Sequence, residues 1–301
     1  IPPKIILNRS FINAKQIVVH SSLNKKSLNN LSKSTTIIDP KTNISMKDFS
    51  DYANTIPNVN MIPGTSKGRY FKIRGIGEIS QFAGEGPPSF SVGYYLDDMD
   101  LSGVGTIGSS FDLSHIEIVK GINNLKSGYN ALGGSINLYS KNPSYQRQGN
   151  INLGLKSYND YDIGLSYSLP ISKVLLTRTT IYKNYSNGHI KNNERNIQNS
   201  NQIDEEFIRT KIVWLPSANY HTKLNLLYYK NDNGYDIFTP DNNGYTTYTD
   251  YPGKDNLQSF ALSLVNHLNL NKTHYKAYLA VTQNIINYNY DGDWGSDDYW
   301  S

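Results

Sequence analysis

The segment that decides the fold is IRTKIVWLPSANYHTKLNLLYY, residues 208–229. Its first half places Ile208 and Ile212 on one side of an extended chain, and Arg209 and Lys211 on the other. A two-residue period of this kind is typical of a β-strand whose two faces meet different surroundings. The second half repeats the alternation after a short connection that contains a proline. The segment therefore predicts two antiparallel strands joined by a tight turn.

The same alternation recurs on both sides of this hairpin and gives seven strand-length segments in all. The other five are residues 150–155, 161–167, 175–182, 260–264 and 277–281. The sequence therefore predicts that the chain from residue 148 onward is an antiparallel β-structure.

The connections between these segments alternate in length. Tight connections at 169–173, 215–220 and 268–273 alternate with long polar stretches at 185–204 and 231–256. Short turns at one end and long loops at the other are typical of an outer-membrane β-barrel, whereas a soluble sandwich has no need to keep all long loops at one end. Seven strands cannot close such a barrel, because bacterial barrels use an even number of strands from eight upward. A sheet left open would expose unsatisfied backbone groups to lipid. We therefore expect further strands after Ser301.

Composition agrees with a membrane barrel and excludes several other classes. The chain has 301 residues, no cysteine, and 24 tyrosines among its aromatic residues, and its mean hydropathy is −0.53. The longest apolar run, residues 277–281, is too short for a transmembrane helix. The absence of cysteine excludes disulfides and thiolate metal sites. The chain begins at Ile1 without a methionine or signal peptide, so we expect a processed or cut N-terminus.

Residues 1–47 form a basic leader with eight lysines and arginines and one acid, Asp39. The segment is rich in Asn, Ser and Lys and has little periodicity, so we expect a flexible tail. Its lysines are dispersed and Phe11 is its one aromatic residue, so a nucleic-acid partner is not expected.

No catalytic constellation is found. Residues 103–108 match GxGxxG, but neither a buried strand before them nor a helix after them is predicted, so a loop is the better interpretation. The six histidines form no close metal-ligand pair. Asp97, Asp98 and Asp100 lack EF-hand spacing and fit a turn after a strand. We expect neither an enzyme nor a cofactor.

Ordered motifs occupy the middle of the chain. They are FKIRGIGE at 71–78, VGYYLDD at 92–98, FDLSHIEIVKG at 111–121, SGYNALGGSINL at 127–138 and KNP at 141–143. In order and spacing they closely resemble the plug domain of TonB-dependent outer-membrane receptors. The resemblance implies a mainly β protein, in which a small mixed α/β plug domain lies inside a 22-stranded antiparallel transmembrane β-barrel. The expected divisions are a leader at 1–47, a plug at 48–147, and about the first seven barrel strands at 148–301.

The resemblance also implies a function. It is energised uptake of a scarce nutrient across the outer membrane of a Gram-negative bacterium, most often of a ferric siderophore. The implied partners are the energy-coupling protein TonB, an iron chelate and outer-membrane lipid, and a monomer is expected. Two alternatives remain: a passive porin-like channel, which would not need a plug, and a secreted carbohydrate-binding β-protein.

Site residues follow from the same resemblance. The segment Gln16, Ile17, Val18, Val19 and His20 resembles the TonB box, which would add as a strand to the partner. Arg74 and Lys120 stand where family members lock the plug to barrel glutamates. Lys120 departs from the family's arginine, and Lys and Arg are not equivalent where a bidentate carboxylate contact is expected. Plug loops near the ligand would contain Gln81, Phe82, Phe90 and Gly105.

Overall fold

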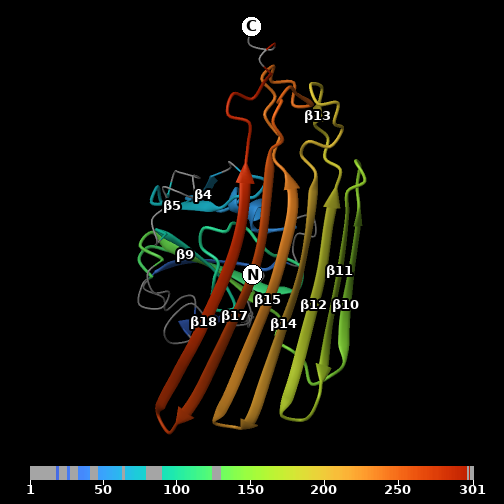
Figure 1. The fold of residues 1–301 in the computed structure, drawn as a ribbon. Helices are drawn as coiled ribbons and strands as arrows, with labels where there is room; N and C mark the ends of the chain where they lie inside the picture. Colours follow the sequence, from blue (N-terminus) through green and yellow to red (C-terminus); the bar gives the residue numbers. More distant parts are fainter. Residues whose placement is uncertain are drawn as a thin grey trace, which may run out of the picture.

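The computed structural model describes residues 18–19, 26–27, 33–40, 47–62, 65–78, 90–123, 130–296 and 298. For residues 18–19 and 26–27 it describes the backbone alone. Figure 1 shows two parts: a tall sheet of long strands, and a group of shorter elements against one of its faces. No helix among these residues is long and apolar enough to cross a membrane.

The tall sheet has seven antiparallel strands in the order β10-β11-β12-β14-β15-β17-β18. Their bounds are Gln148–Leu155, Tyr161–Pro170, Leu175–Ser186, Ile203–Ser217, Tyr220–Gly234, Lys254–Leu270 and Thr273–Asn289. Each strand pairs with the next strand of this order along most of its length. The predicted antiparallel β-structure with seven long strands is therefore confirmed.

The two ends of this sheet differ as the sequence predicted. The connections β11–β12, β14–β15 and β17–β18 are tight and lie at the bottom of Figure 1. The connections β12–β14 and β15–β17 are long and lie at the top. These two long loops contact each other through a parallel pair of short strands, β13 (Lys191–Asn192) and β16 (Thr246–Thr247).

The two faces of the sheet differ, because the outer face exposes large apolar side chains and the inner face mixes buried polar and charged side chains with apolar ones such as Tyr182, Phe207 and Leu227. Large apolar side chains are exposed on one face, among them Ile163, Leu165, Ile181, Ile208 and Val281. Buried polar and charged side chains of the same strands include Ser166, Arg178, Thr180, Arg209, Lys211, Asn225 and Ser263. Apolar-out and polar-in alternation is the pattern of a transmembrane barrel wall and the reverse of a soluble sheet that buries its apolar face.

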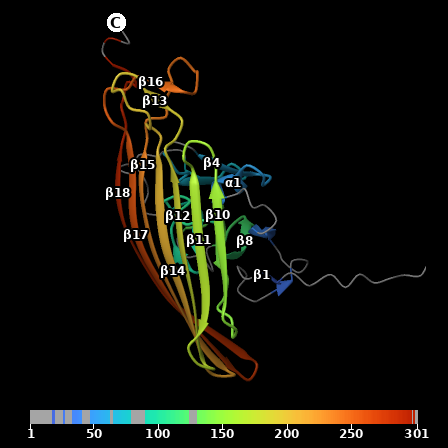
Figure 2. The same cartoon turned by 90° about the vertical axis from the view of Figure 1, so that its right-hand side faces the viewer.

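The shorter elements form a compact plug on the polar face of this wall (Figure 2). A five-stranded mixed sheet has the order β3-β8-β9-β6-β7, with bounds Ser34–Ile38, Leu113–Lys120, Gly134–Ser140, Val92–Leu96 and Met99–Asp100. Strands β6 and β9 are parallel and the other pairs are antiparallel. A second pair, β4 (Val59–Ile62) with β5 (Tyr70–Ile73), lies beside helix α1 (Phe49–Ala53).

The plug has an apolar core that continues onto wall residues such as Tyr182 and Phe207. Phe49 packs edge-on against Phe71, which stacks on Tyr94 with ring centroids 5.4 Å apart. Ile116 and Ile118 of β8 are fully buried in the same cluster. The β-forming residues of the middle region thus build the small mixed sheet that the sequence predicted, except that Ile73 belongs to the separate β4–β5 pair.

The expectation that all of residues 1–47 form a flexible leader is wrong for residues 34–38. These residues form β3, which pairs with β8 from Ser34↔Lys120 to Ile38↔Ile116. Two threonines and two isoleucines in five residues favour a strand, although the surrounding composition is polar and basic. Further upstream, β1 (Val18–Val19) pairs with β2 (Lys26–Ser27).

Candidate functional site

The interface between plug and wall carries the densest set of buried charges among the described residues. Asp112, just before β8, accepts hydrogen bonds from both Nε and Nη2 of Arg178 on β12, the former at 2.7 Å. The Thr180 hydroxyl donates to the same carboxylate at 2.8 Å. Arg178 is 3% and Asp112 5% exposed. A planar guanidinium fork that meets a carboxylate at two points fixes orientation as well as distance.

A second contact comes from the turn between β6 and β7. Asp97 and Asp98 occupy this turn, and both adopt positive φ angles of 48° and 66°. The Asp97 carboxylate lies 2.9 Å from Nζ of Lys211 on β14. Asp98 lies 3.0 Å from Nζ of Lys276 on β18. Asp97 and Asp98 therefore form a turn, as predicted. The turn also docks the plug sheet onto four strands of the wall, since Asn225 of β15 and Ser263 of β17 both donate to the Asp97 carbonyl.

A third contact joins the segment before β5 to β17. Ser66 donates from its backbone and its hydroxyl to Asp255, each at 2.8 Å. Arg69 forms an ion pair with the other oxygen of the same carboxylate. Asp255 is 1% exposed. The single carboxylate of Asp255 therefore holds two points of the plug segment.

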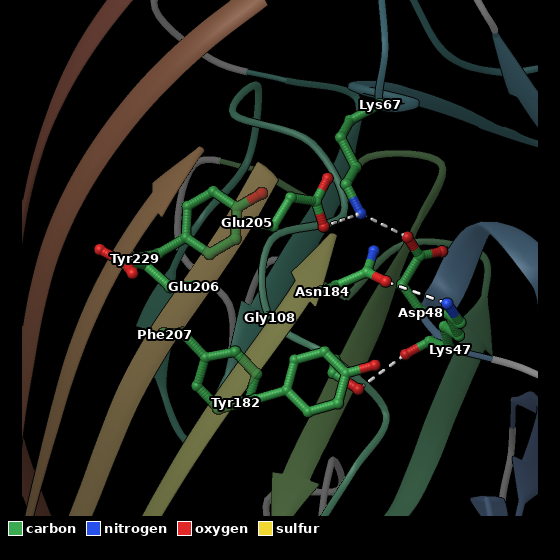
Figure 3. Close-up of a pocket in the computed structure, with 11 residues that line it drawn as sticks. Lys47, Asp48, Lys67, Gly108, Tyr182, Asn184, Glu205, Glu206, Phe207 and Tyr229 are labelled. Carbon is green, nitrogen blue, oxygen red and sulfur yellow. Dashed lines mark hydrogen bonds and ion pairs between the residues drawn. The ribbon is translucent and has the colours of Figure 1, made fainter. Parts of the chain in front are cut away.

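The fourth contact surrounds a small cavity between plug and wall (Figure 3). Lys67 lies between two carboxylates, 2.6 Å from Asp48 of the plug and 2.9 Å from Glu205 of β14. Lys47 extends from the plug to the wall, 2.7 Å from Asp160 and 3.0 Å from the amide oxygen of Asn184. The free space in the cavity is about 20 Å³, enough for about one water molecule. The cavity is therefore too small for a nutrient chelate.

Burial and ion pairing act against each other on the pKa values of the plug carboxyls. Burial alone would raise the pKa of Asp112, but the hydrogen bonds from Arg178 and the charge of Arg209 lower it below its usual value. Burial likewise opposes the charge of Lys211 at Asp97, and the pKa of Asp97 is also lowered. At Lys67, burial would lower the pKa, but Asp48 and Glu205 raise it well above the usual lysine value. All these groups are therefore charged at neutral pH.

Four separate ion-pair contacts hold the plug on the polar face of the wall, in addition to the chain segment 141–147 that joins the two parts. Such contacts are strong while water is excluded and become weaker once water reaches them. No group of three or more metal-ligating side chains is found in the described parts of the chain. The arrangement can therefore hold a movable domain, and it offers no described site for a metal ion.

The predicted lock residues lie elsewhere on the plug. Arg74 is exposed, sits in a turn with φ 55°, and makes no ion pair with any described residue. Lys120 donates to the carbonyl of Pro57 at 2.8 Å. The two side chains are neighbours. The pKa of Lys120 is lowered mainly by its burial and further by the nearby charge of Arg74. The seven strands present do not supply carboxylates to either residue.

The predicted ligand residues are only partly described. Phe90 is half-buried and stacks on Tyr70 with ring centroids 6.0 Å apart. Gly105 is buried against Gly68 and Arg69, so the described conformation offers it no surface for a ligand. Gln81 and Phe82 lie outside the described residues.

The predicted coupling segment is described only in part. The backbone of Val18 and Val19 lies in β1, while Gln16, Ile17 and His20 fall outside the described residues.

Sequence reasoning missed the residues that dock the plug: Lys47, Asp48, Lys67, Asp97, Asp112, Arg178, Glu205, Lys211 and Asp255. Only the inward-facing charges at 178, 209 and 211 gave a signal, because a charge on the lumen face of a wall strand requires a partner. The acid that pairs with each of these wall charges depends on how the plug is placed against the wall. No local sequence pattern encodes that placement.

Comparison with known proteins finds a family match on the plug part of the chain. Residues 27–135 match the model of the TonB-dependent receptor plug domain. The ferripyoverdine receptor of Pseudomonas aeruginosa is 28% identical over 134 residues, which is 42% of this chain and 15% of the receptor.

Solved structures agree on the fold of plug and wall together. The ferric yersiniabactin uptake receptor FyuA from Yersinia pestis matches with a TM-score of 0.74 at 16% identity, over 84% of this chain and 41% of the receptor. The Pseudomonas aeruginosa ferripyoverdine receptor, bound to ferripyoverdine, matches with a TM-score of 0.69 at 14% identity, over 93% of this chain and 38% of the receptor. The chain thus spans less than half the length of these relatives.

Proposed function

We propose a transport function from the premise that this chain comprises the plug domain and the first barrel strands of a TonB-dependent receptor. The whole protein takes up a ferric siderophore through the outer membrane of a Gram-negative bacterium, as a transporter and not as an enzyme. Ligand binding lies on the side of the long loops, and energy enters from the side of the short turns.

One observation carries this proposal. A folded plug is held on the inner face of a wall whose outer face is apolar, and ion pairs hold it there beside apolar contacts such as Phe111 on Tyr182. A passive channel does not need an obstruction of this size. A secreted soluble β-protein would not expose the apolar face of its largest sheet. A transporter that opens by moving its plug needs both features.

The ligand class is supported by the relatives, which are a ferripyoverdine receptor and a ferric yersiniabactin uptake receptor. In this chain the long loops β12–β14 and β15–β17, joined by β13 and β16, are the surfaces that a ligand would meet first. Phe90, with Gln81 and Phe82 in the adjoining segment, remains our candidate for the plug side of the ligand site.

The coupling residues remain Gln16 to His20, which would pair as an added strand with TonB. Backbone hydrogen bonds would then carry a pulling force with little side-chain specificity. We propose a domain division in which the plug begins near residue 33 and the barrel near residue 148. The whole protein is proposed to be a monomer in lipid.

Uptake of radioactive iron by cells that express the full-length receptor tests this function. Each of a panel of ferric chelates is offered in iron-limited medium, with and without an uncoupler of the proton motive force. We expect energy-dependent uptake of at least one chelate. Uptake that is insensitive to the uncoupler would indicate a passive channel, and failure of every chelate would contradict siderophore transport.

A further inference from the structure

Lys47 occupies a special place in the chain, between the edge strand β3 and the rest of the plug. Its side chain reaches the wall at Asp160, Asn184 and Asp162, the last at 3.4 Å. Its carbonyl accepts hydrogen bonds from the Ser109 hydroxyl at 2.9 Å and the Ser110 amide at 2.7 Å. One residue therefore ties the main chain of the plug both to the loop before β8 and to two strands of the wall.

The next residue extends this attachment. Asp48 is the N-cap of α1, where its side chain accepts from the Ser50 amide at 2.8 Å. The same carboxylate binds Lys67, which in turn binds Glu205 on the wall. Figure 3 shows Lys67 between Asp48 and Glu205, and the Lys47 side chain bound to Asn184 of the wall. Together, Lys47, Asp48 and Lys67 form what we call the clamp.

The segment before the clamp is held much less firmly. β3 is an edge strand with one neighbour, β8, and five paired residues. Its side chains are half-buried or exposed, so its removal uncovers little apolar surface. In the five-stranded sheet it is the first strand in sequence and so the first that a pull on the N-terminus would load.

From this arrangement we infer that Lys47 is a positioning residue for transport: it marks the point where a pull on the N-terminus stops unfolding the plug. The inference rests on the proposed function. Strand β3 leaves the plug under force. The clamp then holds α1, β4 and the following elements against the wall, so that only one side of the plug opens.

Cysteine labelling tests this inference, because the 301 residues contain no native cysteine. Thr36→Cys reports on β3, and Ala53→Cys reports on α1, where Ala53 is fully buried. Both are placed in the full-length receptor, and a membrane-impermeant maleimide is applied from the periplasm during energised uptake. We expect about tenfold faster labelling of position 36 when uptake is energised, and no change at position 53.

The clamp is then removed by Lys47→Met. We expect position 53 to become labelled about tenfold faster during energised uptake, and Lys47→Arg, which keeps the charge, to restore its protection. Lys72→Met is the matched control, because Lys72 is a half-buried plug lysine outside the clamp. Protection of position 53 in Lys47→Met, or its labelling with Lys47 intact, would overturn the inference.

Iron uptake is measured in the same cells to separate two kinds of failure. Energised uptake without any labelling at position 36 overturns the inference alone. Absence of uptake and of energy-dependent labelling at both positions overturns the proposed function, and with it the inference.

Discussion

The Asp112 carboxylate of the plug accepts hydrogen bonds at both oxygens from the guanidinium of Arg178, 66 residues further along the chain. Arg209, on the adjacent wall strand, donates to the carbonyls of Phe111 and Asp112. Two arginines therefore hold the residues that lead into β8, the strand between β3 and β9. This contact fixes where the plug sheet sits along the wall.

The first prediction concerns Arg178. Arg178→Met leaves Asp112 in a buried site with Lys141, 3.3 Å away and partly exposed, as its remaining ion-pair partner, and with the charge of Arg209 nearby. We expect the plug to be held less tightly by about 3 kcal/mol, because a buried carboxylate loses its bidentate partner. Susceptibility of the plug to protease in purified receptor, measured over a urea series, checks this.

Arg147→Met is the control for this prediction, because Arg147 is an exposed arginine between plug and wall. The double variant Arg178→Met with Asp112→Asn should recover much of the loss, since no buried charge is then left unpaired. Equal protease susceptibility of Arg178→Met and the unmodified receptor would contradict the assignment.

The second prediction concerns acid. The lowered pKa values of Asp97 and Asp112 mean that their contribution to stability is fully present above the ordinary aspartate value of about 3.9. That contribution is lost as the pH falls through the lowered values. We expect the protection of backbone amides in β8 and β9 against hydrogen exchange to stay constant near neutral pH. That protection should fall below about pH 4.

Lys67 affects the stability of the plug at high pH instead of low pH. Its raised pKa means that its contribution is fully present below the ordinary lysine value of about 10.4, and is lost as the pH rises through the raised value.

Asp112→Asn should remove part of the acid transition. A transition near pH 6 in place of the acid one would point to histidines and contradict the role of these carboxylates.

The third prediction concerns Gly134, the first residue of β9. Its φ is +148°, and a Cβ there would lie 2.3 Å from the Val119 carbonyl oxygen and 2.8 Å from Cδ1 of Ile73. We expect Gly134→Ala to destabilise the plug by about 3 kcal/mol through backbone strain and overpacking. Gly292→Ala, where a Cβ meets no atom within 4 Å, is the control. A thermal scan of receptor that shows equal plug stability for both variants would contradict this prediction.

The wall was predictable because each strand carries its own signal. Alternation along 208–214 shows which side chains share a face, and the lengths of the connections show which ends share a side. Strand β3 was missed, since five residues inside a basic, polar segment are too few for the period to stand out. Asp97 and Asp98 were predicted as a turn, and that is correct because turn chemistry is local.

The docking contacts were not predictable for a different reason. The partner of Arg178 is chosen by the register between a wall strand and a loop of another domain, 66 residues away in sequence. Gly105 illustrates the same limit, because a glycine-rich stretch predicts a loop but not whether that loop is buried. Both outcomes depend on how two folded units meet.

The fourth prediction concerns the coupling segment. Ile17→Pro should abolish energised iron uptake and leave chelate binding to the cell surface intact, because proline removes a backbone donor from a strand that must pair. Ile6→Pro, further upstream in the same basic segment, is the control and should leave uptake unchanged. Normal uptake by Ile17→Pro would place the coupling segment elsewhere.

The last prediction concerns Arg74 and Lys120. Arg74 is exposed and has no carboxylate among the described residues, so we expect its partner in a part of the receptor barrel outside them. Lys120 already donates to the Pro57 carbonyl and offers a point charge without a planar fork. Arg74→Ala should therefore loosen the plug by about 1–3 kcal/mol, and Lys120→Ala by less.

Conductance in planar bilayers and sensitivity of cells to large antibiotics measure this loosening in the full-length receptor. We expect Arg74→Ala to be leakier than Lys120→Ala at similar surface expression. Arg147→Ala is the control for an exposed arginine outside the plug motifs. If Arg74→Ala and Arg147→Ala behave alike, Arg74 is an ordinary exposed arginine. The four contacts described above would then account for plug docking without the lock that the family resemblance implies.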